Sequence, residues 1–172
     1  MNKFPAYLIG NIISTNSAEA FTIYKKSAFG EPVEGKIQYS LTESIYLFEK
    51  NKIEIFQNNK LISKNEFLKK LQKIDKKISL KYSVFKDLRD KGYIVKTALK
   101  FGADFRVYPK GTRPGKSHAK WLVFAEHESK KHTWQDFASK NRVAHSTKKK
   151  LLLAIIDEEN KISYYEVSWV KP

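Results

Sequence analysis

The chain of 172 residues contains no cysteine, which excludes disulfide bonds, thiolate metal sites and cysteine nucleophiles. No apolar run approaches the roughly 20 residues that cross a bilayer, and residues 1–14 are too polar for a signal peptide. We therefore expect a cytoplasmic protein with no membrane partner. The sequence also lacks internal repeats and low-complexity tracts. Its length of 172 residues fits one large domain or two small ones.

Acidic residues are scarce as well. The chain has 18 Asp+Glu against 33 Lys+Arg, which gives a net charge of +15 and a pI near 9.8. A coat of solvated lysines would give the same totals, but the excess is uneven. Residues 1–80 hold 13 basic and 8 acidic residues (net +5), whereas residues 81–172 hold 20 and 10 (net +10) and all four arginines. A basic, arginine-containing second half favours a nucleic-acid partner.

The first half of the chain, residues 1–80, has the pattern of a small α/β domain. We expect short strands and turns at its start, including a strand over 21–24, and a half-buried strand over 52–56. Two pairs of residues have the spacing of capping boxes that begin helices: Ser40 with Glu43, and Ser63 with Glu66. No cluster of residues in this half suggests chemistry.

The second half, residues 81–172, predicts a sheet with helices packed on it. The continuous apolar runs 121–125 and 151–156 are typical of central strands that are covered on both faces. Further strands are expected at 93–95, 105–108 and 162–170, and helices before Gly92 and over 133–139. The strand over 105–108 should place Arg106 and Tyr108 on one face, because side chains alternate along a strand.

Three side chains of the second half can together cleave RNA: the phenol of Tyr108, the imidazole of His118 and the ammonium of Lys149. Such groups can take a proton from a ribose 2′-hydroxyl, give one to the leaving 5′-oxygen and neutralise charge on the phosphorane. Taken singly, each has an ordinary alternative as a half-buried tyrosine, a surface histidine or a solvated lysine. Lys148 and Lys150 are close competitors for the lysine role, although in an extended segment they would face away from Lys149.

Three longer stretches carry a resemblance to a known family. They are YSVFKDLRDKGYIVKTALKFGADFRVY, SHAKWLV and NRVAHSTKKKLLLAIIDEENKISYYEVSWVKP. In order and without large gaps they resemble the C-terminal domain of archaeal tRNA-splicing endonucleases. Residues 1–80 are similar to the family's N-terminal domain only in size and element order. The resemblance implies an α/β (α+β) protein with a small N-terminal α/β domain, 1–80, and a catalytic domain, 81–172, built on a mixed, restriction-endonuclease-like sheet.

The resemblance also implies an activity and roles for residues. Precursor tRNA would be cut at bulge–helix–bulge exon–intron junctions, without a metal or cofactor, to leave 2′,3′-cyclic phosphate and 5′-hydroxyl ends. Tyr108 would be the general base, His118, opening the next strand, the general acid, and Lys149 the group that steadies the transition state. Arg142 would stack on a flipped-out bulge base. The acidic tip, defined as Asp157, Glu158 and Glu159, would dock on a neighbouring subunit of a homotetramer or of a heterotetramer with a structural subunit.

Two alternatives remain open at the level of sequence. Asp104 followed by Glu128 and Lys130 loosely imitates the D…ExK arrangement of metal-dependent nucleases of related fold. A non-catalytic RNA-binding subunit would share the basic charge, but it would have no need for the tyrosine, the histidine and the lysine together.

Overall fold

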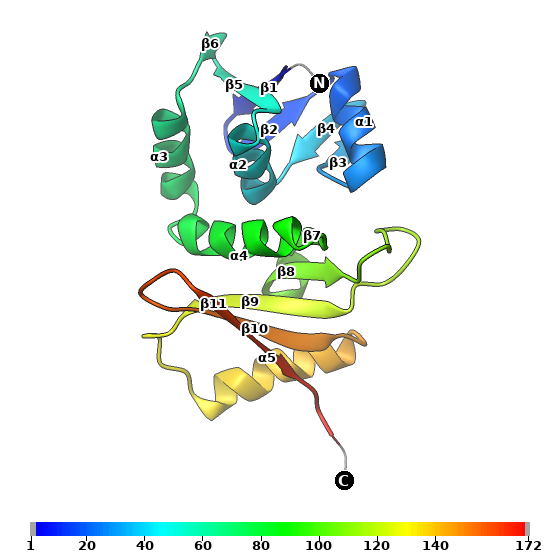
Figure 1. Cartoon of the computed structure of the whole chain (residues 1–172), viewed down its shortest axis with the longest axis vertical. Coiled ribbons are helices and arrows are strands. Elements are labelled where there is room, and N and C mark those ends of the chain that lie inside the picture. The colour runs from blue at the N-terminus through cyan, green and yellow to red at the C-terminus, as the bar shows by residue number, and fades with distance from the viewer. Residues whose placement is uncertain (1–2, 171–172) are drawn as a thin grey trace. The chain divides into compact units, whose positions relative to one another are not determined.

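The computed structural model describes residues 3–170. These residues form two compact units that divide between Tyr82 and Ser83. Figure 1 labels the α-helices and strands of both units. In order they are β1 (Phe4–Ile9), β2 (Ile12–Thr15), α1 (Ala18–Ser27), β3 (Glu31–Val33), β4 (Lys36–Tyr39), α2 (Leu41–Glu49), β5 (Ile53–Gln57), β6 (Lys60–Leu61), α3 (Lys64–Ile74), α4 (Ile78–Asp90), β7 (Ile94–Ala98), the 3-10 helix η1 (Leu99–Phe101), β8 (Ala103–Tyr108), β9 (Trp121–His127), α5 (Trp134–Ser146), β10 (Lys150–Ile156) and β11 (Ile162–Val167). Within residues 3–170, no helix is long and apolar enough to cross a membrane.

The first unit is built on a six-stranded sheet in the order β3-β4-β2-β1-β5-β6. The pair β1–β5 is parallel and the other pairs are antiparallel, so the sheet is mixed. The predicted capping box at Ser40 is confirmed, because its hydroxyl accepts from the amide of Glu43 and the Glu43 carboxylate accepts from the Ser40 amide. At Ser63 the hydroxyl accepts from the amide of Glu66 at 3.3 Å. Both helices therefore begin where the sequence indicates.

The strand expected over residues 21–24 is wrong, because these residues lie inside α1. Phe21, Thr22, Ile23 and Tyr24 are aromatic or β-branched residues, which favour strands when taken alone. The packing of the unit overrides this preference, since Ala20 and Ile23 are buried together at helical spacing. The helix then ends at Ala28, which takes the left-handed conformation with a φ of 55°.

The close packing of Gly30 against Ile37 of β4 can be tested by mutation. The φ of Gly30 is +74°, and a Cβ atom at this position would lie 2.3 Å from Cγ2 of Ile37, which is completely buried. We expect Gly30→Ala to lower the free energy of unfolding by about 2–5 kcal/mol, from left-handed strain and overpacking together. The matched control is Gly35→Ala, where φ is +75° and no atom lies within 4 Å of the added Cβ. It should cost only about 1–2 kcal/mol. Urea unfolding measures both values, and equal losses would contradict the packing argument.

The second unit is built on a five-stranded mixed sheet in the order β11-β10-β9-β8-β7, in which only β9 and β10 run parallel. The prediction that residues 121–125 form a central strand is confirmed, because β9 is the middle strand of the five. Residues of α4 cover one face, where the rings of Phe85 and Phe105 lie 5.9 Å apart. Helix α5 covers the other face with Ala144, which is buried against Leu122 and Leu151 (Figure 1).

Helix α5 is almost twice as long as the sequence indicates. We expected a helix over residues 133–139, whereas α5 continues to Ser146. Phe137 and Ala144, seven residues apart, face the same hydrophobic cluster under the sheet, and this burial stabilises the second half of the helix. A capping box between Thr133 and Asp136 fixes its start. The longer helix places Arg142 and His145 on α5 rather than in a loop.

Candidate active site

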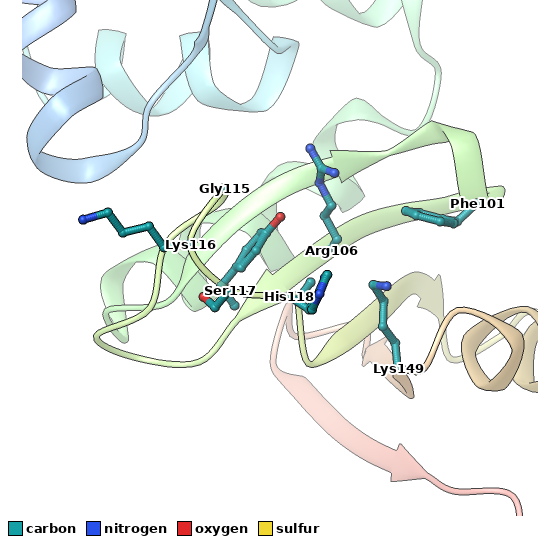
Figure 2. Close-up of a pocket in the computed structure, with 9 residues that line it drawn as sticks. Phe101, Arg106, Gly115, Lys116, Ser117, His118 and Lys149 are labelled. Carbon is teal, nitrogen blue, oxygen red and sulfur yellow. The ribbon is translucent and has the colours of Figure 1, made fainter.

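A cavity of about 360 Å³ lies in the second unit and brings the three predicted catalytic side chains together. Figure 2 shows the cavity with His118 and Lys149 labelled. It is lined by Phe101, Arg106, Tyr108, Gly115, Lys116, Ser117, His118, Ala119 and Lys149. These residues come from η1, from β8, from the loop between β8 and β9, and from the turn between α5 and β10. The lining contains one phenol, one imidazole and three cationic side chains, and no carboxylate. Such a cavity suits an anion.

Tyr108 reaches the cavity from the last position of β8. The predicted alternation holds, since Arg106, two residues earlier, lines the same cavity. Tyr108 is only 5% exposed, so neighbouring side chains hold its ring in place. The strand is paired on both sides, with β7 through Ile94 opposite Tyr108 and with β9 through Trp121 opposite Val107. A phenol at the end of such a strand has a well-defined position.

His118 reaches the cavity from an ordered loop. The hydroxyl of Thr112 donates to the carbonyl of Pro109 at 2.7 Å, and the amide of Ser117 donates to the carbonyl of Arg113 at 3.1 Å. The amide of Lys120 donates to the carbonyl of Val107 at 2.9 Å and so ties the end of the loop back to β8. The expectation that His118 opens the next strand is wrong, because β9 begins at Trp121. His118 is an exposed loop residue, which leaves its ring accessible to a substrate.

Lys149 reaches the cavity from the turn that joins α5 to β10. Its amide donates to the carbonyl of Ala144 at 2.8 Å, and its Nζ donates to the carbonyl of Thr147 at 2.8 Å. The Nζ also lies 5.2 Å from the centre of the Phe101 ring, as in a cation–π contact. Burial, and secondly the positive charge of Arg106, lower the pKa of Lys149 below that of an ordinary lysine. The ammonium is therefore held in place close to a second cation.

The two neighbouring lysines do not line this cavity. Lys150 is the first residue of β10, and its ammonium pairs with the carboxylate of Glu166 on β11. Lys148 has a φ of 55°, in the left-handed region, so the segment is not extended there as the sequence argument assumed. A tight turn, rather than strand alternation alone, separates Lys149 from its neighbours.

Sequence reasoning did not include Arg106 and Phe101 among the site residues. The signal for Arg106 was present, since a residue two positions before Tyr108 on the same strand must share its face. Phe101 gave no such signal. Its ring lies near Lys149 in the fold, but the two residues are almost 50 positions apart in the sequence. The cavity is also lined by residues that flank His118 in the loop between β8 and β9: Gly115, Lys116, Ser117 and Ala119.

Arg142 and the acidic tip lie outside the cavity. Arg142 is exposed on α5, four residues before the end of that helix. The acidic tip forms the turn between β10 and β11, where Asp157 accepts the amide of Lys161 at 2.8 Å and the amide of Glu158 donates to Glu128 at 3.2 Å. Glu158 and Glu159 are exposed, as a contact with another subunit would require.

The residues of the D…ExK alternative, Asp104, Glu128 and Lys130, each have a different partner in the structure. The carboxylate of Asp104 accepts the amide of Ala125 at 2.9 Å, and the ammonium of Lys130 pairs with Glu126 at 2.9 Å. Glu128 instead accepts the amide of Glu158 at the acidic tip. In the part of the chain that the structure describes, no group of three or more His, Asp or Glu residues could hold a metal ion.

Comparison with known proteins gives matches along most of the chain. The family model of the tRNA intron endonuclease catalytic C-terminal domain matches residues 78–164, and that of the N-terminal domain matches residues 5–68. The tRNA-splicing endonuclease of Nanoarchaeum equitans is 48% identical over 138 residues, which cover 77% of this chain and 88% of that protein. The tRNA-splicing endonuclease of Thermococcus kodakarensis is 40% identical over 166 residues, or 96% of this chain and 97% of the relative. That of Methanothermobacter thermautotrophicus is 41% identical over 150 residues, or 87% of each chain.

Proposed function

The chain belongs to the tRNA-splicing endonuclease family, and we propose that it cuts precursor tRNA at bulge–helix–bulge exon–intron junctions by attack of the neighbouring 2′-oxygen. The observation that carries the proposal is that a single cavity is lined by Tyr108, His118 and Lys149. The products would be a 2′,3′-cyclic phosphate and a 5′-hydroxyl.

In the proposed reaction, the phenolate oxygen of Tyr108 takes the proton of the 2′-hydroxyl, and the 2′-oxygen forms a bond to the scissile phosphorus. The phosphorus–5′-oxygen bond breaks, and the leaving oxygen takes its proton from the His118 imidazolium. The Lys149 ammonium donates to the non-bridging oxygens while charge accumulates on them. The positions of the three residues support these roles, since one strand end, one loop and one turn present them to the same cavity.

The distribution of charge supports an RNA substrate. Residues 81–172 carry a net charge of +10, and three of their cations line the cavity, whose lining has no carboxylate. Arg142 is exposed on α5, and a planar guanidinium at such a position can stack on an unpaired bulge base. We assign it a role in binding the bulge rather than in the chemical step, because it lies outside the cavity lining.

An assembly of subunits is part of the proposal. Each precursor tRNA is cut at two junctions, whereas residues 3–170 of one copy present one such set of catalytic groups. The acidic tip is suited to an electrostatic contact with a basic surface, and β11 presents the exposed ring of Tyr165 for an apolar contact. Two different contacts can build a homotetramer, or a heterotetramer with a structural subunit, and the mass of the purified particle distinguishes these from a monomer.

Cleavage in excess EDTA tests the proposed chemistry. We expect a bulged precursor tRNA to be cut at both junctions without a divalent ion, in moderate monovalent salt that keeps the RNA folded, because base, acid and charge all come from side chains. The control is the same RNA carrying a 2′-deoxy sugar at each cleavage position, which should remain intact. Activity that disappears in EDTA and returns only with Mg²⁺ or Mn²⁺ would favour the metal-dependent alternative instead.

A further inference from the structure

We propose that Arg106 is a second cation of the catalytic cavity, whose guanidinium binds a non-bridging oxygen of the scissile phosphate beside Lys149. The inference rests on the proposed function and adds a residue to it. Arg106 belongs to the lining of the cavity, together with Tyr108, His118 and Lys149. Figure 2 labels Arg106, His118 and Lys149.

The backbone of β8 explains how Arg106 comes to this place. Side chains alternate along the strand, so Arg106 shares the face of Tyr108, whereas Phe105 turns to the opposite face and packs on Phe85. Arg106 lies opposite Leu122 of the central strand β9, and Leu122 is part of the cluster under α5. The side chain therefore emerges on the α5 face of the sheet, the face from which the turn after α5 delivers Lys149.

Electrostatics indicate that Arg106 and Lys149 act on the same small volume. The positive charge of Arg106 is close enough to contribute, after burial, to the lowered pKa of Lys149. Two like charges at close range in a partly buried site repel one another. An anion bound in the cavity would relieve the repulsion between Arg106 and Lys149.

The charge of the reacting phosphate explains why two cations are useful there. A phosphodiester carries one negative charge, and the pentacoordinate phosphorane that forms during attack carries two. Groups that are already in place where the second charge develops lower the barrier, because they stabilise the transition state more than the ground state. Lys149 provides a point charge, and the planar guanidinium of Arg106 adds two parallel donors that match phosphate oxygens. We therefore expect Arg106 to act on the rate rather than on affinity.

The test compares Arg106→Gln and Arg106→Lys with the wild-type chain and with Arg89→Gln. Arg89 is the matched control, because it lies in the last turn of α4 and donates to the carbonyl of Tyr93 at 3.4 Å, outside the cavity lining. We expect Arg106→Gln to slow single-turnover cleavage of a bulged precursor by about 10²–10³-fold. Binding of the 2′-deoxy RNA should change less than about threefold, and Arg106→Lys should recover part of the rate because it restores the charge without the fork.

A substrate with a phosphorothioate at the cleavage site shows whether Arg106 contacts the phosphate or has only a structural role. Sulfur in place of the oxygen that Arg106 binds should slow the wild-type chain and should have little further effect in Arg106→Gln. A rate for Arg106→Gln within about threefold of wild type would overturn the proposal. So would a loss of rate that parallels a loss of thermal stability, or an unchanged sulfur effect. If the wild-type chain left the bulged precursor intact, the proposed function itself would be wrong. If the wild-type chain cuts the precursor and Arg106→Gln cuts it equally fast, only the inference on Arg106 is wrong.

Discussion

Replacing His118 with alanine is expected to slow single-turnover cleavage of a bulged precursor tRNA by about 10²–10⁴-fold, the usual contribution of a general acid. The 5′-oxygen is a poor leaving group unless it gains a proton while its bond to phosphorus breaks. Binding of RNA should change little, because His118 is a single exposed loop residue on a chain with a net charge of +15. A gel-shift titration with the 2′-deoxy RNA measures binding separately from the rate.

A substrate with a bridging 5′-sulfur tests the role of His118 directly. A thiolate leaves without a proton, so this substrate should be cut by His118→Ala at nearly the wild-type rate, while Lys149→Ala should remain slow. His127→Ala is the matched control, because His127 ends β9 and hydrogen-bonds to Ser129 at 2.8 Å, outside the cavity lining. If the bridging sulfur gave no rescue of His118→Ala, the histidine would have another role, such as orienting the phosphate.

Replacing Lys149 with alanine is expected to slow cleavage by about 10²–10³-fold, since it removes a charged donor aimed at the developing oxyanion. Lys148→Ala and Lys150→Ala are the matched controls, and each should change the rate less than about threefold. Lys150→Ala loses the ion pair with Glu166. The side chain of Lys150 is 45% exposed and that of Glu166 is 35% exposed. Such a pair contributes about 0–1 kcal/mol to stability. A larger loss of rate in Lys150→Ala than in Lys149→Ala would show that the wrong lysine has been assigned.

The pH dependence offers a second readout for Lys149. Burial, followed by the charge of Arg106, lowers the pKa of Lys149, so its ammonium loses the proton at a lower pH than an ordinary lysine. The stabilising charge is present below this pKa and disappears as the pH rises through it. The wild-type rate should therefore fall more steeply on the alkaline side than the rate of Lys149→Ala, which lacks the contribution of Lys149. A fall that persists unchanged in Lys149→Ala would belong to another group.

Much of the catalytic unit could be predicted because its strands are strongly marked. The run over 121–125 is apolar at every position, as is typical of a strand covered on both faces. It proved to be the middle strand of five. Tyr108 was placed on the correct face by alternation alone. Recognising His118 and Lys149 as its companions required the longer resemblance, since neither residue lies on a regular element.

The errors have physical reasons. The strand expected over 21–24 followed local preference, whereas burial of Ala20 and Ile23 decided for helix α1. The short helix expected after Thr133 ignored the seven-residue spacing of Phe137 and Ala144, because polar residues dominate the segment between them. The likeness of the first half to the family was also underestimated, since residues 5–68 match the family's N-terminal domain model.

In the proposed mechanism, the junction between α5 and β10 links the activity of this nuclease to the behaviour of one helical turn. Lys149 stays in the cavity because its amide caps α5 at Ala144, which is completely buried. Tyr108 and His118 come from β8 and its following loop, so they do not depend on that turn. Fraying of the last turn of α5 would remove the lysine and leave the other two groups in position. Activity on warming should therefore follow the local opening free energy of this turn, which hydrogen exchange at the Lys149 amide measures, and should decline before the sheet melts.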